Sequence, residues 1–320
     1  LDRALEIAPK ADKDQNIYDL TIQQMAISLI NICSGKWDEM PEYDKLILKA
    51  GAENGLFWDM GAYLHVQGAL KVYQGKFSQA RELLDEFVFL EEKYGYGPIS
   101  PKYTMYTELF VTSRLLFEAQ NMANILISFS VKMGQIEDLM GYGWLAVAQV
   151  LMKDINGARD SLEQAEQSRS KQSFWTPWYL SSSLLGQFML DLHLLEDAIS
   201  GGSRSLISKQ AKAARKSGRR AVRNATKFAP RRTENYRLMG EYYWLVGKQC
   251  KAFQWFDKSI KEGERLGARP DLSRTYMEVG KRLLEPQSKF KELNGISAPE
   301  YLNKAETLFR EMDLQWDLEQ

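Results

Sequence analysis

The densest group of side chains able to do chemistry is a run of eleven arginines and lysines between residues 204 and 232. No acidic residue occurs from 198 to 233. Clustered guanidinium groups form paired hydrogen bonds with carboxylates or phosphates, so this run suits an anionic partner. Small and apolar residues recur between the cations at steps of three and four. This spacing predicts a helix that packs a seam of small residues inward and points its arginines outward. The seam residues are Ile207, Ala211, Ala214, Gly218, Val222 and Ala225.

Three interpretations of this basic run stay open. The first is a solvated outer helix whose charges meet acidic neighbours. The second is a contact surface for an acidic partner or for an upstream domain of the same parent chain, with Arg215, Arg219, Arg220 and Arg223 as candidate contact residues. The third, nucleic acid, is the least favoured, because only Phe228 lies nearby for base stacking and 42 basic residues balance 42 acidic ones.

A dense aromatic group, Phe174-Trp-Thr-Pro-Trp-Tyr179, is the second candidate contact site. Trp175 and Trp178 are residue types that often dominate the binding energy of an interface. Aromatic side chains equally fill the core between helical repeats, and this interpretation is favoured.

Other residues with catalytic or metal-binding chemistry are scattered. His65 and His193 are the only histidines, and neither has a cysteine or histidine at ligand spacing. Cys33 and Cys250 are far apart and are expected to be free structural thiols. The acidic residues between 82 and 92 cluster on an expected solvated helix face.

Glycine-rich nucleotide motifs are also missing. Gly141-Tyr-Gly-Trp-Leu-Ala146 fits a loose dinucleotide fingerprint, but it follows a helical segment instead of a strand. No complete Walker A sequence can be assembled from the Gly-Lys pairs. We therefore expect no catalytic residue, no cofactor, no metal site and no enzymatic activity in this chain.

The elements that would position these side chains follow a repeat. Seven residues in register resemble the tetratricopeptide pattern, in which aromatic, large apolar and small residues occupy fixed positions along two antiparallel helices. They are Tyr236, Met239, Gly240, Tyr243, Gly247, Ala252 and Phe256. Gly240 and Ala252 fall where the helices touch, since only small side chains allow that approach. Gly247 falls at the end of the first helix, where a left-handed conformation is favoured.

Weaker copies of the pattern use Gly68, Gly75, Ala80, Leu84 and Phe87, and then Tyr142, Ala146, Ala158, Leu162 and Ala165. Helical periodicity continues through 18–33, 103–117, 178–195 and 271–284. The predicted fold class is all-α, a right-handed solenoid superhelix of about seven antiparallel helix pairs. We expect residues 1–320 to form one such domain cut from a longer chain, as an open curved ribbon with grooves. Residues 1–10 would end a truncated repeat, and 285–299 would be an inserted loop.

The C-terminal quarter resembles a more specific family. Gly267 to Gly280 and Ala305 to Leu318 look like the helical-repeat tails of large bacterial signalling ATPases, of the adenylate or guanylate cyclase-linked type or the transcriptional-activator type. The resemblance implies a regulatory tail whose ATPase or cyclase activity lies in a missing N-terminal part. It also implies a cytoplasmic location.

The functional hypothesis is a non-catalytic scaffold or sensor that binds a protein or peptide, including upstream domains of its own parent chain. The alternative is an autoinhibitory region of an ATPase or cyclase that binds a small inducer between its helices. A membrane role is not expected, because the longest apolar run, Asn124 to Val131, is much shorter than the roughly 20 residues that a spanning helix needs.

Overall fold

Most of the described chain is helical. The computed structural model describes residues 17–95, 100–134 and 136–319. In chain order the helices are α2 (Ile17–Ser34), η2 (Trp37–Glu39), α3 (Lys45–Glu53), α4 (Phe57–Tyr73), α5 (Phe77–Tyr94), α6 (Ser100–Thr112), α7 (Leu116–Met133), α8 (Asp138–Leu151), α9 (Ile155–Ser170), α10 (Pro177–Ser200), α11 (Arg204–Ala225), η3 (Ala229–Arg231), α12 (Arg232–Leu245), α13 (Gln249–Leu266), α14 (Arg269–Leu284), α15 (Ala298–Glu311) and α16 (Gln315–Leu318).

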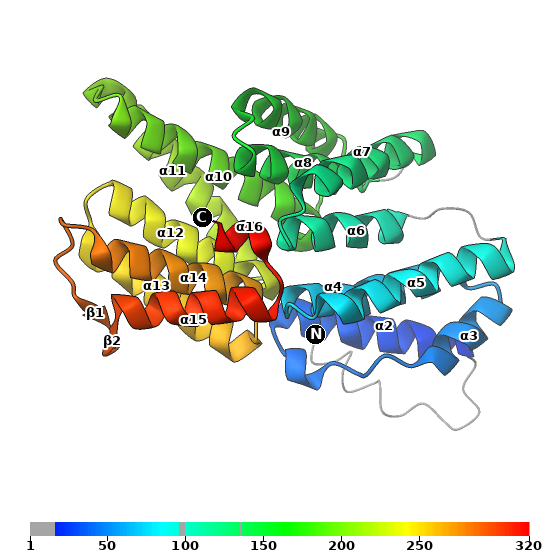
Figure 1. Cartoon of the computed structure of the whole chain (residues 1–320). Coiled ribbons are helices and arrows are strands. Elements are labelled where there is room, and N and C mark those ends of the chain that lie inside the picture. Colours follow the sequence, from blue (N-terminus) through cyan, green and yellow to red (C-terminus); the bar gives the residue numbers. More distant parts are fainter. Residues whose placement is uncertain (1–16, 96–99, 135, 320) are drawn as a thin grey trace.

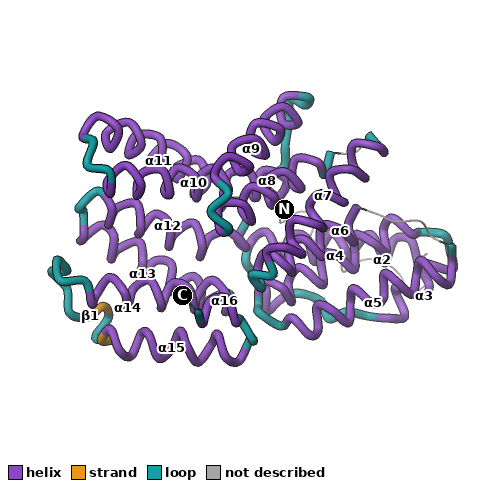
Figure 2. Tube along the Cα trace, turned by 45° about the horizontal axis from the view of Figure 1, so that its top comes forward, coloured by secondary structure: helices purple, strands orange, loops and turns teal. Residues whose placement is uncertain are grey.

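These helices pack as successive pairs, from α2 with α3 to α14 with α15, and each pair stacks on the next (Figure 1). The predicted all-α solenoid of helix pairs is therefore confirmed. Figure 2 shows short turns between many of the helices, and longer connections before α3, α10 and α15. The expected end of a truncated repeat at 1–10 lies outside the described residues.

The register predicted for the repeat at 236–256 is also confirmed. Gly240 on α12 faces α13 so closely that a Cβ there would lie 2.3 Å from the ring of Phe256. Ala252 has no exposed surface. Gly247 has a φ of +73°, the left-handed conformation expected where the first helix of the pair ends.

One predicted helical stretch is wrong. Residues 103–117 do not form one helix, because α6 ends at Thr112 and α7 begins at Leu116. Arg114 between them has a φ of 60°, and Lys153 takes the same conformation between α8 and α9. The sequence lacks the usual glycine at these two turns, so the break leaves no compositional signal.

The segment before α15 contains a small hairpin. Strands β1 (Glu292–Leu293) and β2 (Ile296–Ser297) pair antiparallel around Asn294 and Gly295, which both have positive φ. Helix α15 begins at Ala298, inside the range predicted as an inserted loop, and Ser297 with Glu300 forms its capping box.

The stacked pairs curl until the first ones touch the last ones, so the ribbon is closed and not open as expected. Figure 1 shows α4 (blue) beside α15 and α16 (red), with the middle helices above them. One continuous core holds residues from both ends, including Tyr73 and Met312. The Arg265 guanidinium donates to the carbonyl oxygen of Gly35 at 2.9 Å, which ties α13 to the end of α2.

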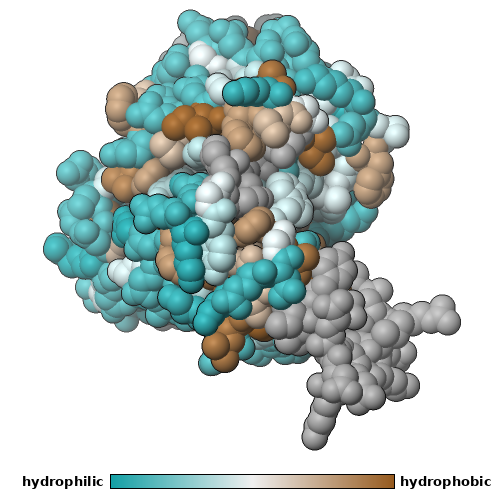
Figure 3. All heavy atoms as spheres, turned by 90° about the vertical axis from the view of Figure 1, so that its right-hand side faces the viewer, coloured by the Kyte–Doolittle hydropathy of each residue, from teal (hydrophilic) through white to brown (hydrophobic). Residues whose placement is uncertain are grey.

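The outer surface shown in Figure 3 is mainly hydrophilic, with apolar side chains in separate spots among polar ones. The most exposed large apolar side chains of the described residues, Phe174 and Leu46, lie far apart in the sequence. Isolated apolar side chains of this kind are normal on a protein surface.

Close packing at Ala252 predicts the result of enlarging it. Ala252→Leu should lower the free energy of unfolding by about 1–3 kcal/mol, because the added atoms overpack the seam between α12 and α13. Urea denaturation measures the change, and Gln254→Leu on the exposed side of α13 is the matched control. Equal stability of the two variants would show that the register is wrong.

Candidate functional site

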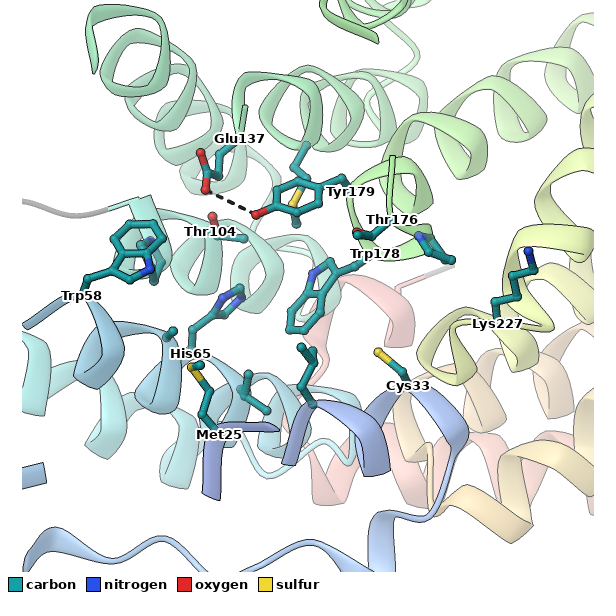
Figure 4. Close-up of a pocket in the computed structure, with 16 residues that line it drawn as sticks. Met25, Cys33, Trp58, His65, Thr104, Glu137, Thr176, Trp178, Tyr179 and Lys227 are labelled. Atoms are coloured by element: carbon teal, nitrogen blue, oxygen red, sulfur yellow. Dashed lines mark hydrogen bonds between the residues drawn. The ribbon is translucent and has the colours of Figure 1, made fainter. Parts of the chain in front are cut away.

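An apolar cavity of about 330 Å³ lies where α2, α4, α6, α8 and the start of α10 meet. Figure 4 shows the side chains of these elements converging on it, with Trp58 and His65 from α4 and Trp178 and Tyr179 from α10. Helix α10 begins with Pro177 at its first position, which is favoured there because the missing amide hydrogen has no helical partner. This start places both aromatic residues in the first turn, at the cavity. We call this feature the aromatic cavity.

Trp178 forms the central wall of the aromatic cavity. Its indole stacks on Phe228 with ring centroids 5.5 Å apart, and Phe228 is fully buried. On its other side the His65 ring lies 5.2 Å away. Pairs of rings at these distances stabilise a fixed arrangement beyond simple burial, so the wall is preorganised.

Polar groups gather at one end of the aromatic cavity. The Nε2 atom of His65 lies 3.6 Å from Oε2 of the buried Glu108. The Tyr179 hydroxyl donates to Oε1 of Glu137 at 3.5 Å, as Figure 4 shows. Burial, with the Glu137 charge, raises the pKa of Tyr179, so this hydroxyl stays a hydrogen-bond donor at neutral pH.

The thiol in the lining of the cavity is unreactive. It belongs to Cys33, and burial raises its pKa to about 12. A neutral thiol is a poor nucleophile. The remaining walls are mainly aromatic and aliphatic, with Thr104, Thr176 and Lys227 among them. This composition favours a largely apolar ligand with a few hydrogen-bonding groups.

Behind the polar end of the cavity begins a chain of buried charges. Glu108, with no exposed surface, accepts a hydrogen bond from the Tyr73 hydroxyl at 3.0 Å. The Arg231 guanidinium lies 3.7 Å from Glu108 and 3.9 Å from Glu234. It also stacks over the Trp144 ring at 4.4 Å. Planar stacking and paired carboxylates together allow the guanidinium to remain charged while buried.

The chain of charges continues across the centre of the molecule. Arg274 on α14 binds both carboxylate oxygens of Asp317, at 2.9 and 2.7 Å, and donates to the Thr112 carbonyl oxygen at 2.8 Å. Arg237 hydrogen-bonds Glu241 on the same helix. A hollow of about 500 Å³ opens beside these groups. The buried and partly buried charged residues that we call the central charge network are Glu108, Arg114, Arg231, Glu234, Arg237, Glu241, Asp271, Arg274 and Asp317.

Sequence reasoning missed this network. Its members on α12 are spaced by three and four residues with alternating sign, at Glu234, Arg237 and Glu241. That pattern is typical of a solvated helix face, so it did not indicate buried charges. The repeat register was the signal that could have revealed the network. It places Met239 and Gly240 on the packed side of α12, and because this helix is short, little of it is left to face water.

The candidate arginines of the sequence analysis lie together, apart from the aromatic cavity. Arg215, Arg219, Arg220 and Arg223 are all exposed on one side of α11, while Ala214, Gly218 and Ala225 on the opposite side are buried. The inward seam and outward arginines are as predicted. The last two cations of the run behave differently, because Arg231 is buried and Arg232 pairs with Glu262 at 3.1 Å.

The two candidate tryptophans do not share a site. Trp178 lines the aromatic cavity, whereas Trp175 donates its indole hydrogen to the Arg169 carbonyl oxygen at 2.8 Å and packs beside Tyr179. Both are partly buried. Trp175 fastens the end of α9 to the start of α10, a structural role, while Trp178 is available to a ligand.

The other sequence motifs lie within helices of the repeat. Gly141 to Ala146 lies within α8, so the dinucleotide fingerprint sits in a helix, as expected. His65 and His193 are partly buried on helices. In the described ranges, no three histidine, cysteine or acidic side chains lie together as metal ligands would. No helix among these residues is long and apolar enough to cross a membrane.

Comparison with known proteins gives the fold but no family. No protein-family model and no curated protein match the chain. Among solved structures it is similar to the crystal structure of a Rap protein complexed with Competence and Sporulation Factor, with a TM-score of 0.55 and 11% sequence identity. The similarity covers 93% of this chain and 88% of that chain. It supports a tetratricopeptide-like helical repeat as the fold.

The central charge network predicts how stability depends on pH. Burial, opposed by Arg237, raises the pKa of Glu241 to about 7. Because the folded state then holds a proton that the unfolded state has already lost, the contribution of Glu241 to stability falls as pH rises from about 4.5 to 7. Glu241→Gln should therefore weaken the decline in melting temperature over this range.

Thermal unfolding by circular dichroism between pH 5 and 8 measures the effect. A difference of about 2–4 °C corresponds to 1 kcal/mol in a large domain. Glu92→Gln, on an exposed position of α5, makes the same charge change and should leave the pH profile as it is. A Glu241→Gln protein with the native profile would contradict the raised pKa of Glu241 in the folded protein.

Proposed function

We propose that the chain is a non-catalytic regulatory module that binds a protein or peptide partner through the aromatic cavity. The cavity carries the proposal, because about 330 Å³ with apolar walls and a few polar groups at one end is the composition of sites that bury an apolar group. The fold similarity supports it, since the Rap protein of that structure is complexed with Competence and Sporulation Factor.

The proposal extends to the setting of the module. The resemblance of Gly267 to Gly280 and Ala305 to Leu318 to the tails of bacterial signalling ATPases supports a place in a multidomain bacterial signalling protein of the cytoplasm. Upstream domains of the same parent chain are then candidate partners. Any ATPase or cyclase activity would belong to those domains.

Partial filling of the cavity tests peptide binding. Ala62 lines the cavity and is partly buried, so Ala62→Leu occupies part of the volume. Peptides selected from a random displayed library on the native protein should bind this variant at least tenfold more weakly, a change of about 1.4 kcal/mol. Fluorescence anisotropy with labelled peptides measures the affinity.

Ala26→Leu is the matched control, because Ala26 is exposed on α2 and does not line the cavity. Its peptide affinity should equal that of the native protein. Selected peptides that bind the Ala62→Leu variant as tightly as the native protein would exclude the cavity as the binding site. Failure to select any peptide would count against a peptide-binding module.

A small inducer is the second candidate ligand, and the Trp178 indole favours it. Its nitrogen is buried and has no hydrogen-bond partner among the described residues, so a ligand with one acceptor atom would satisfy it. A set of metabolites, screened by thermal unfolding, should then include compounds that raise the melting temperature with increasing concentration. Ala62→Leu should abolish such a rise, and a screen without any hit would favour the peptide partner.

A further inference from the structure

The exposed side of α11 carries six cations in a single row. We call them the basic face: Lys212, Arg215, Lys216, Arg219, Arg220 and Arg223. Their side chains border a surface hollow of about 410 Å³. Steps of three and four residues place them on one side of the helix, and a rise of 1.5 Å per residue makes the row about 16 Å long.

The basic face has few acidic partners: Glu166 borders the same groove as Arg220 but pairs with Arg169. Within the described part of the chain, none of its six cations forms an ion pair with a carboxylate, whereas most other arginines, such as Arg232 and Arg282, do. The ion pairs that the first interpretation from the sequence expects are therefore not formed by these six cations in the described residues. Like charges in a row repel one another, and an acidic partner would relieve this repulsion.

A groove runs beside the basic face. Helices α9 and α11 both pack on α10 but diverge from each other, as Figure 2 shows. Between them lies a hollow of about 270 Å³ with a mixed lining. Its apolar side chains are Leu162, Ala165 and Leu184, and its polar ones include Glu166, Gln187 and Ser217. Arg220 borders both this groove and the hollow of the basic face, which makes them one continuous surface.

We propose that α9, α10 and α11 form a docking surface for an acidic amphipathic helix of a partner protein. The apolar stripe of the partner helix lies in the groove, and its carboxylates, spaced by three and four residues, meet the basic face at the matching helical pitch. Arginines suit this role because each guanidinium forms two parallel hydrogen bonds with one carboxylate. The surface is separate from the aromatic cavity and does not depend on the ligand bound there.

Nucleic acid fits this surface less well. No aromatic side chain lines the groove or the hollow of the basic face, so bases would have nothing to stack on. Glu166 borders the groove, and although Arg169 pairs with it at 2.5 Å, its carboxylate would repel a phosphate chain.

The test uses a fluorescein-labelled synthetic peptide with glutamates on one helical face and leucines on the other. A peptide of the same composition in scrambled order is the reference. We expect the periodic peptide to bind the native chain at least tenfold more tightly than the scrambled one, with an affinity that falls as salt rises. The triple variant Arg215→Glu, Arg219→Glu and Arg223→Glu should lose at least tenfold in affinity.

The control variant reverses three exposed cations elsewhere, Arg81→Glu, Lys132→Glu and Lys291→Glu, with the same change in net charge. Its affinity should stay within twofold of the native value. Equal binding of the scrambled peptide would overturn the amphipathic docking surface. Tighter binding of a single-stranded oligonucleotide, with the same sensitivity to the triple variant, would assign the surface to nucleic acid. Self-association abolished by the triple variant, without peptide binding, would assign it to a second copy.

Discussion

Buried charge, paired between the first and the second half of the ribbon, is the constraint on which this structure depends. Glu108 comes from α6, and Arg231 comes from the short helix before α12, more than a hundred residues later. Neither group has more than a few per cent of exposed surface, so each needs the other to remain charged. Removing one partner of such a pair typically costs 3–5 kcal/mol, because the remaining charge is left buried and uncompensated.

This constraint connects the closed shape to the candidate site. Glu108 forms the start of the central charge network and also stands behind His65, at the polar end of the aromatic cavity. An open ribbon would expose the network to water and remove the support of that end. On the outside of the ring, arginines have a different environment. Those of the basic face form no ion pair with a described carboxylate. Arginine therefore pairs with carboxylates inside the array and is exposed without an ion pair on the basic face.

The sequence predicted the features that depend on side-chain size. Gly240 and Ala252 are small because two helices touch there, and the seam of α11 at Ala214 and Gly218 is small for the same reason. The break at Arg114 was not predictable, because an arginine there adopts a positive φ that usually requires glycine. The cavity was not predictable either, since it combines side chains of five helices that only the curvature of the array brings together.

The central charge network escaped sequence analysis for a different reason. Alternating charges at helical spacing look the same whether they face water or one another, and only the closure of the ring decides between the two. Closure depends on small angular differences between neighbouring pairs, which the repeat pattern does not encode. The two surfaces proposed for binding, the aromatic cavity and the basic face, thus rest on a shape fixed by tertiary contacts.

The most direct test of this account is the coupling energy between Glu108 and Arg231. A double-mutant cycle with Glu108→Gln and Arg231→Met, followed by urea unfolding, measures it. If the buried pair closes the ring, the two changes together will cost less than the sum of the single changes, with a coupling of about 1–3 kcal/mol. Effects that add within about 0.5 kcal/mol would show that the two groups act independently, and would contradict closure by paired buried charge.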